Sequence, residues 1–277
     1  MNKGTLYIVG TPIGNLGDIS PRALDTLRAA DFIAAEDTRV TLKLLNHFEI
    51  KRPLVSYYQH NMAERSDAII ARIAAGESCA LVSDAGMPAI SDPGEVLVRL
   101  AHDAGITVCA APGPSAAVTA LCLSGMPGGR FCFEGFLSTN PRSRREHLTS
   151  LKTERRTMIF YEAPRKLIGT LRDMLEYFGD RPLAIGRELT KLHEEIIKTT
   201  LSQALTTYEI TPPRGEFVLI IAGVEEEERE SDMTIEDVAA HARRLMQEGA
   251  SASSAAKQAV KDTPFGKSDV YKMITTQ

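Results

Sequence analysis

The sequence lacks long apolar runs and closely spaced cysteines, and each absence excludes a class of protein. Its longest apolar runs are far short of a bilayer span, so no transmembrane helix is predicted. The chain enters its first strand without a signal-peptide core, which favours a cytoplasmic protein. The four cysteines (Cys79, Cys109, Cys122 and Cys132) have no metal-like spacing. We therefore expect no metal site. Because most of the cysteines lie in apolar surroundings, we expect them to be buried free thiols in a reducing compartment.

A large excess of charge of either sign is also missing. The chain has 36 acidic and 32 basic residues and a net charge of −4, so any contact with nucleic acid must come from a local basic patch. At 277 residues and 43% hydrophobic content, the chain is long enough for two domains, each with its own core.

Short apolar runs alternate with helical stretches through most of the chain. In the first part, strands are predicted at 5–9, 32–35, 54–57, 79–83 and 107–110. The intervening helices and short loops favour a parallel α/β sheet. Further strands at 131–134, 158–161, 183–186, 195–199 and 217–222 predict a second α/β domain with more scope for antiparallel pairing. The expected domains are 1–118 and 119–224.

The end of the chain has a different character. Residues 225–232 form an acidic linker that is too charged to pack. Helical stretches at 234–247, 253–260 and 267–275 then predict a helix–turn–helix-like tail over 233–277. Such a module binds nucleic acid in some proteins and only packs in others, and the nearly balanced charges here leave both interpretations open.

Three loops rich in glycine and proline follow strands of the first predicted sheet, at 10–21, 83–94 and 111–117. In the middle loop, Asp92 is expected to cap a helix that starts at Pro93. Because the carboxyl ends of parallel strands share one edge of a sheet, the three loops predict a ligand crevice there. The first loop is not a GxGxxG motif, and Pro12 occupies a position that would need a donor, so nicotinamide binding is poorly supported.

Polar residues at strand ends and one basic segment supply candidate chemistry. Glu36, Asp37 and Arg39 follow the second strand, and His60 follows the third; each is either a cleft residue or a solvated cap. The segment 142–156 carries a local basic excess in an acidic chain, and its candidate RNA-binding residues are Arg142, Arg144, Arg145, Arg155 and Arg156. This segment is either a phosphate-contacting patch or a solvated helix face.

Several motifs, taken in order, resemble one family. They are Thr-Pro-Ile-Gly-Asn-Leu at 11–16, Ala-Glu-Asp-Thr-Arg at 35–39, Ser-Asp-Ala-Gly-Met-Pro at 83–88, Pro-Gly-Pro at 112–114, Phe-Tyr-Glu at 160–162, Arg-Glu-Leu-Thr-Lys at 187–191 and Gly-Glu at 215–216. Together they closely resemble the bacterial 16S ribosomal RNA (cytidine) 2′-O-ribose methyltransferases of the tetrapyrrole methylase superfamily. The likeness runs from about residue 5 to 223, and the tail resembles the family's C-terminal helix–turn–helix.

The resemblance implies two α/β domains, tetrapyrrole methylase-like, with S-adenosylmethionine (SAM) in the cleft between them, usually in a homodimer. The implied reaction methylates the ribose 2′-hydroxyl of a cytidine in the decoding region of 16S rRNA in the small ribosomal subunit. Carried over by motif, cofactor contacts are expected at Pro12, Asp84, Ala85, Gly86, Pro88, Ser91, Pro112, Gly113, Pro114, Ser115, Tyr161, Glu162, Gly215, Glu216 and Phe217.

Such a reaction requires an aligned ribose oxygen and removal of its proton. Lys191 is the leading catalytic candidate, either as a desolvated amine acting as base or as a cation beside the developing oxyanion. Glu36, Asp37, Arg39 and His60 are the other candidates. Two alternatives remain open. One is a methyltransferase of a small tetrapyrrole, which the basic segment and the tail disfavour. The other is a non-enzymatic nucleic-acid-binding regulator built on the tail.

Overall fold

The computed structural model describes residues 3–224, 234–261, 263 and 265–276. The chain forms two compact units that divide after Val224. The expected acidic linker lies outside the described residues. No helix in the described part of the chain is long and apolar enough to cross a membrane.

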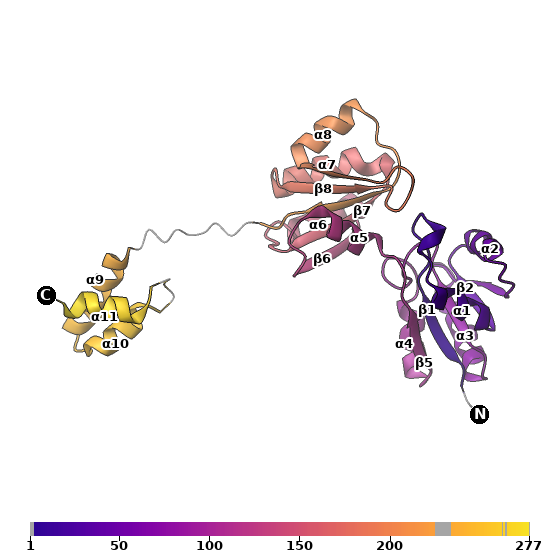
Figure 1. Ribbon diagram of the computed structural model, residues 1–277, viewed down its shortest axis with the longest axis horizontal. Helices are drawn as coiled ribbons and strands as arrows, with labels where there is room; N and C mark the ends of the chain where they lie inside the picture. The colour runs from indigo at the N-terminus through magenta and orange to yellow at the C-terminus, as the bar shows by residue number, and fades with distance from the viewer. Residues whose placement is uncertain (1–2, 225–233, 262, 264, 277) are drawn as a thin grey trace. The chain divides into compact units, whose positions relative to one another are not determined.

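The first sheet is parallel throughout, as predicted, with the strand order β3-β2-β4-β1-β5 (Figure 1). Its strands are β1 (Thr5–Val9), β2 (Phe32–Ala35), β3 (Leu54–Ser56), β4 (Cys79–Val82) and β5 (Thr107–Ala111). The connecting elements are η1 (Leu16–Asp18), α1 (Pro21–Ala29), α2 (Thr38–His47), α3 (Met62–Ala74) and α4 (Glu95–Asp103). Residues alternate between two cores, so that Leu6 packs with α3 and α4 and Val9 packs with α1 and α2. Burial on both faces explains the continuous apolar runs of these strands.

The strand order brings the three predicted loops together at one edge of this sheet, because β4, β1 and β5 are neighbours. Thr11 and Gly86 exchange backbone hydrogen bonds of 2.9 and 3.1 Å between the first two loops. Gly10 and Gly113 join the first loop to the third, since a Cβ built on Gly10 would lie 2.6 Å from the Cα of Gly113. Only glycine permits this approach.

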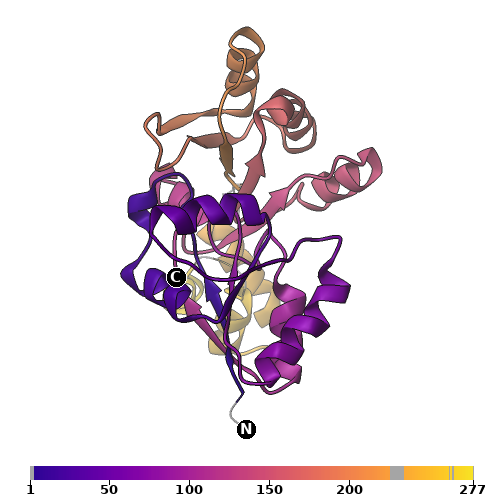
Figure 2. The ribbon, with the colours of Figure 1, turned by 90° about the vertical axis from the view of Figure 1, so that its right-hand side faces the viewer.

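The second sheet is mixed, with the order β6-β7-β10-β8-β9, in which only β6 and β7 pair in parallel. Its strands are β6 (Phe131–Phe136), β7 (Thr157–Glu162), β8 (Pro182–Arg187), β9 (Glu195–Thr200) and β10 (Phe217–Ile221). Helices α6 (Pro141–Ser150), α7 (Pro164–Phe178) and α8 (Leu201–Ile210) cover one face, and α5 (Ala116–Ser124) covers the other. In Figure 2 the two sheets, with their helices, form two lobes of this unit.

Helix α5 follows the last loop of the first sheet but belongs by packing to the second. Its residues Ala117, Ala120 and Leu121 lie against strands β7, β8 and β10. The domain boundary expected between residues 118 and 119 therefore falls inside a single helix.

Two local predictions were wrong. Helix α4 begins at Glu95 with Gly94 as its N-cap, so Asp92 does not cap it. A left-handed residue at Ala89 (φ 67°) bends the loop, and the Asp92 carboxyl group faces Ser83 instead. The cysteines are free, but only Cys79 is buried; Cys109 lies on edge strand β5, Cys122 is on the outward side of α5, and Cys132 is half-buried.

The C-terminal unit contains α9 (Ile235–Gln247), α10 (Ala252–Ala259) and α11 (Lys267–Thr275), which confirms the three predicted helices. Thr234 and Asp237 form a capping box at the start of α9. The small core includes Val238, Ala255 and Val270.

Candidate functional site

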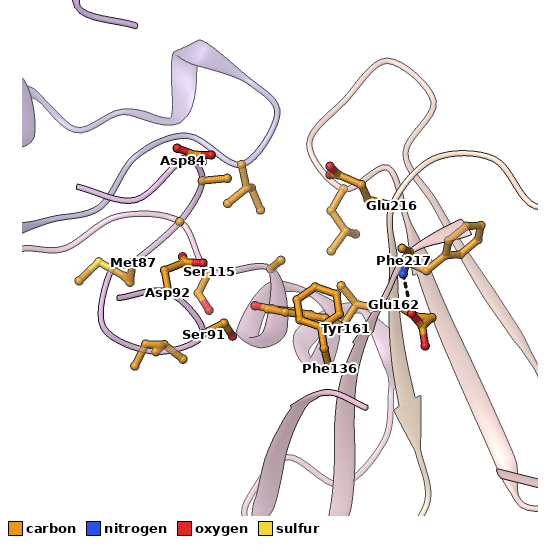
Figure 3. Close-up of a pocket in the computed structure, with 18 of the residues that line it drawn as sticks. Asp84, Met87, Ser91, Asp92, Ser115, Phe136, Tyr161, Glu162, Glu216 and Phe217 are labelled. Carbon is orange, nitrogen blue, oxygen red and sulfur yellow. Dashed lines mark hydrogen bonds between the residues drawn. The ribbon is translucent and has the colours of Figure 1, made fainter. Parts of the chain in front are cut away.

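A cavity of about 510 Å³ lies between the two sheets of the N-terminal unit. One side consists of the loop after β4 together with Ser115, and the other consists of residues from β7 and β10 (Figure 3). Ten of the predicted site residues line it: Glu36, Asp84, Ala85, Gly86, Ser91, Ser115, Tyr161, Glu162, Glu216 and Phe217. The cavity is of the size and mixed polarity typical of small-molecule sites.

Tyr161 extends across the cavity towards the first-sheet loops (Figure 3). Its hydroxyl accepts a 3.1 Å hydrogen bond from the backbone N–H of Ala117. The rings of Phe133 and Phe136 pack edge-on against it, with centroids 5.0 and 5.5 Å away. Burial raises the pKa of Tyr161, so the cavity contains a fixed, neutral phenol beside an apolar ring surface.

Three carboxyl groups give the cavity its negative character. Burial, followed by repulsion from Asp92, Asp84 and Asp37, raises the pKa of Glu36 from 4.5 to about 7. Burial also raises the pKa of Asp84 and of Asp92. A bound cation would relieve this repulsion, so the cavity favours a positively charged ligand.

Glu162 lines the cavity, but its carboxylate is already engaged. Its Oε1 accepts a 2.8 Å hydrogen bond from the N–H of Ala163, and its Oε2 accepts one from the hydroxyl of Thr170. The residue is almost fully buried and holds the start of helix α7 against strand β7.

The remaining predicted cofactor positions do not line this cavity. They are Pro12, Pro88, Pro112, Gly113, Pro114 and Gly215. Gly113 sets the distance between two loops, as described above. Gly215 (φ 88°) leaves room for Glu188, whose Cγ, Cδ and Oε1 atoms would lie 2.6–2.8 Å from any Cβ there. These residues shape the backbone around the cavity, and their contact with a cofactor stays a prediction.

Lys191 is not among the residues that line the cavity, but it is bonded to one of them. Its Nζ donates to Glu188 Oε1 at 2.8 Å and to Glu216 Oε2 at 3.0 Å, and Glu216 is a lining residue. Partial burial lowers the pKa of Lys191, but the two carboxylates outweigh this effect and raise it overall. The geometry therefore favours the cationic role for Lys191 over that of a neutral base.

Three of the other catalytic candidates, Asp37, Arg39 and His60, do not line the cavity. Asp37 caps α2, and its carboxylate forms an ion pair of 2.6 Å with Arg39, whose hydrogen bonds hold the pKa of Asp37 well below its usual range. His60 is exposed and packs edge-on against Tyr58, with a centroid distance of 6.2 Å. Of the four secondary candidates, Glu36 alone is a lining residue.

Not all of the arginines in the predicted basic patch are exposed at the protein surface. Arg144 is 17% exposed and donates to Asp173 at 2.5 Å and to Thr170 at 3.0 Å. Arg142 and Arg156 are exposed but pair with Glu146 and Glu154 at 2.9 and 2.8 Å. Arg145 and Arg155 are exposed.

Several lining residues were not among the predicted site residues, notably Asp92, Met87 and Phe136. Asp92 and Met87 lie in the predicted loop at 83–94, and Phe136 follows Gly135 at the end of β6. Their positions in the Gly/Pro loop and at a strand end were the available signals.

Comparisons with known proteins define the class of this fold and site. Residues 5–205 match the family model for tetrapyrrole (corrin/porphyrin) methylases. Among solved structures, a diphthine synthase matches with a TM-score of 0.61 and 15% identity over 79% of this chain and 89% of that one. A uroporphyrin-III C-methyltransferase from Thermus thermophilus matches with a TM-score of 0.56 and 21% identity over 79% and 94%. At these identities, the two structures support the fold alone.

Three curated relatives, all named ribosomal RNA small subunit methyltransferase I, are much closer in sequence. The protein from Synechocystis sp. is 46% identical over 98% of this chain and 97% of its own length. The Thermotoga maritima protein is 50% identical over 80% and 100%, and that from Bacillus subtilis is 44% identical over 98% and 94%. The chain belongs to the tetrapyrrole methylase family and, within it, to the group of the small-subunit rRNA methyltransferases I.

Proposed function

We propose that this protein is a cytoplasmic SAM-dependent enzyme that methylates the ribose 2′-hydroxyl of a cytidine in the decoding region of 16S rRNA. The observation that carries this proposal is the match of 44–46% identity with relatives named as small-subunit rRNA methyltransferases over 98% of the chain. That match includes the C-terminal tail, which lies beyond the family model at residues 5–205.

The cavity between the sheets suits SAM. Its volume of about 510 Å³ accommodates a ligand of that size. Glu36, Asp84 and Asp92 supply negative charge for a ligand with a sulfonium and an ammonium group. Phe136 and Tyr161 offer ring surfaces against which an adenine can pack. When bound, SAM supplies an electrophilic methyl carbon.

The protein's own residues then have three roles: they position the ribose hydroxyl, stabilise negative charge on its oxygen and accept its proton. They would position the ribose oxygen to receive the methyl group that bound SAM would supply. The Lys191 ammonium, bonded to the lining residue Glu216, stabilises negative charge that develops on the oxygen. Glu36, which lines the cavity and is held ionised by the bound cationic ligand, accepts the proton.

The exposed arginines of the 142–156 segment provide phosphate contacts to the small ribosomal subunit. Four of the arginines have solvent-accessible side chains: Arg142, Arg145, Arg155 and Arg156. Arg144 instead forms an ion pair with Asp173 that stabilises the fold. Contacts of this kind position an RNA without reading its sequence.

The enzyme acts as a homodimer through α5 and edge strand β5. Helix α5 has no charged residue, and while one side packs on the second sheet, Val118 and Leu123 are 49% and 43% exposed on the other. Cys109 on β5 and Cys122 on α5 are exposed as well. A helix that is apolar on all sides requires cover on all sides.

Light scattering of the purified protein tests the dimer. The double variant Val118→Glu and Leu123→Glu should be monomeric at concentrations where the wild type is dimeric. The control Ile210→Glu, which changes an apolar residue that is 79% exposed at the end of α8, should leave the dimer intact. A monomeric wild type would contradict this part of the proposal.

The reaction is tested by incubating the protein with methyl-labelled SAM and small ribosomal subunits from a strain that lacks this methyltransferase. Label in the RNA is the expected result. Binding of SAM without RNA labelling, together with labelling of a uroporphyrinogen-type acceptor, would favour the small-tetrapyrrole alternative. Binding of nucleic acid without transfer of a methyl group to any acceptor would favour the alternative of a non-enzymatic nucleic-acid-binding regulator.

A further inference from the structure

A second, smaller cavity of about 280 Å³ lies beside the first. Its walls come from three segments: the loop after β1, helix α2 and the end of β4. The lining residues are Thr11, Pro12, Gly14, Leu16, Val40, Thr41, Lys43, Leu44, Ser83 and Asp84. We call this cavity the α2 groove.

Asp84 lines both the α2 groove and the larger cavity, so the two spaces meet at its side chain. Asp84 Oδ1 accepts a 3.0 Å hydrogen bond from the backbone N–H of Asp37, and the carboxylate has capacity for further donors. A hydroxyl bound at the Asp84 end of the groove would therefore face the cavity in which we place the methyl donor.

The lining of the groove suits one nucleoside. Leu16 and Val40 are large apolar side chains that are 41% and 40% exposed, and together with Leu44 they provide apolar walls for the face of a base. Exposed Lys43 places an ammonium group at the same site, where it can contact a phosphate.

Thr41 supplies an independent indication of a missing polar partner. The residue is 3% exposed, and its hydroxyl has no hydrogen-bond partner among the described residues. A buried hydroxyl without a partner is costly, and such groups are rare in folded proteins. Thr41 lines the groove, but its hydroxyl oxygen is covered in the free protein, so a base would reach this hydroxyl only by displacing the neighbouring side chains as it enters.

We propose that the α2 groove binds the target cytidine, with its base between the η1 loop and helix α2 and its ribose at Asp84. This proposal rests on the proposed function and locates the acceptor within it. An enzyme that modifies a nucleotide must extract it from its stacked neighbours, and a groove of about 280 Å³ has the volume for one extruded nucleoside.

Matched substitutions on one helix test the proposal in the full-length protein. Val40→Asp places a charge in the groove, whereas Leu42→Asp places the same charge on α2 at a residue that is 49% exposed and is not among the lining residues. Thr41→Val removes the unpartnered hydroxyl while keeping the shape of the side chain. For each variant we would measure the kcat/KM for small subunits, the Kd for SAM and the Tm.

Val40→Asp should lower kcat/KM at least tenfold while the Kd for SAM stays within about twofold, and Leu42→Asp should change neither quantity by more than about twofold. Thr41→Val should lower kcat/KM by about five- to tenfold without lowering the Tm, because it removes no hydrogen bond of the free protein. If Val40→Asp fails to fold, Leu16→Asp tests the opposite wall.

Equal activity of Val40→Asp and Leu42→Asp would overturn the proposal, as would a loss of SAM affinity that accounts for the loss of activity. Failure of the proposed function is a separate outcome, because the wild-type protein would then label no RNA in the same assay.

Discussion

The backbone N–H of Asp37 donates a 3.0 Å hydrogen bond to Oδ1 of Asp84 and so joins the start of helix α2 to the loop after strand β4. The two residues are 47 positions apart in the sequence. Through this bond, the residue shared by the two cavities is fixed relative to the helix that forms one wall of the α2 groove.

Asp84→Asn should separate the structural role of this side chain from its charge. The amide oxygen can still accept from Asp37, so we expect a Tm close to that of the wild type. Loss of the negative charge should weaken SAM binding about tenfold. Binding of S-adenosylhomocysteine, whose sulfur is uncharged, should weaken less. Calorimetric titration with both ligands measures this difference, and equal losses for the two would contradict a role for the charge.

The raised pKa of Glu36 predicts a pH dependence of stability. Between pH 4.5 and about 7 the folded protein retains a proton that the unfolded chain has lost, so the contribution of Glu36 to stability falls as the pH rises through this window. Glu36→Gln resembles the protonated form. Its Tm should exceed that of the wild type at pH 8, and the two values should converge towards pH 4.5.

The same carboxyl group couples stability to the ligand. A cationic ligand that lowers the pKa of Glu36 should raise the wild-type Tm more at pH 8 than at pH 5.5. Thermal melts with and without SAM at the two pH values measure this effect. If the Tm difference between the wild type and Glu36→Gln did not depend on pH, the pKa of the Glu36 carboxyl group would not be raised by folding.

Lys191→Met should lower kcat by about 10²- to 10³-fold with little change in the Kd for SAM, because it removes the cation placed beside the developing oxyanion. Lys191→Arg preserves the charge and should retain more activity. A purely structural role would instead lower the Tm through the loss of the contacts with Glu188 and Glu216 and leave turnover near normal. Single-turnover rates and melting curves distinguish these results.

Arg144 and Arg145 are adjacent on α6, but replacing each of them by glutamine should have different effects on stability and on RNA binding. Arg144→Gln breaks bonds to Asp173 and Thr170 and should cost about 1–3 kcal/mol of stability. Arg145→Gln should leave the Tm unchanged and weaken binding to the small subunit, reducing the slope of log K against log salt by about one. If both variants only destabilised the protein, the phosphate-contact role of this segment would be wrong.

Much of the fold could be predicted because its signals are local. Continuous apolar runs mark strands that are buried on both faces, and the Ser20-Pro21 pair marks the start of helix α1. The bounds of helix α2 were not predicted even though Asp37 is a good N-cap, because the polar motif around it was interpreted only as the end of a strand.

The details of the site depend on contacts between distant residues and could not be predicted locally. Nothing near Arg144 distinguishes it from Arg145; the difference comes from Asp173 on another helix. Likewise, the Asp-Pro pair at 92–93 is a normal helix start, but helix α4 begins only at Glu95, and Asp92 lines the cavity instead. Lys191 is kept charged by the nearby Glu188 together with Glu216, and Glu216 lies 25 residues away.

The most direct test of the central claim is the chemical identity of the methylated nucleoside. Small subunits from a strain that lacks this activity would be treated with the protein and SAM, and their RNA would be digested and analysed by mass spectrometry. We expect 2′-O-methylcytidine, with the bond on its 3′ side resistant to alkali and the site in the decoding region. A methyl group on a base, or an RNA with no added methyl group, would contradict it.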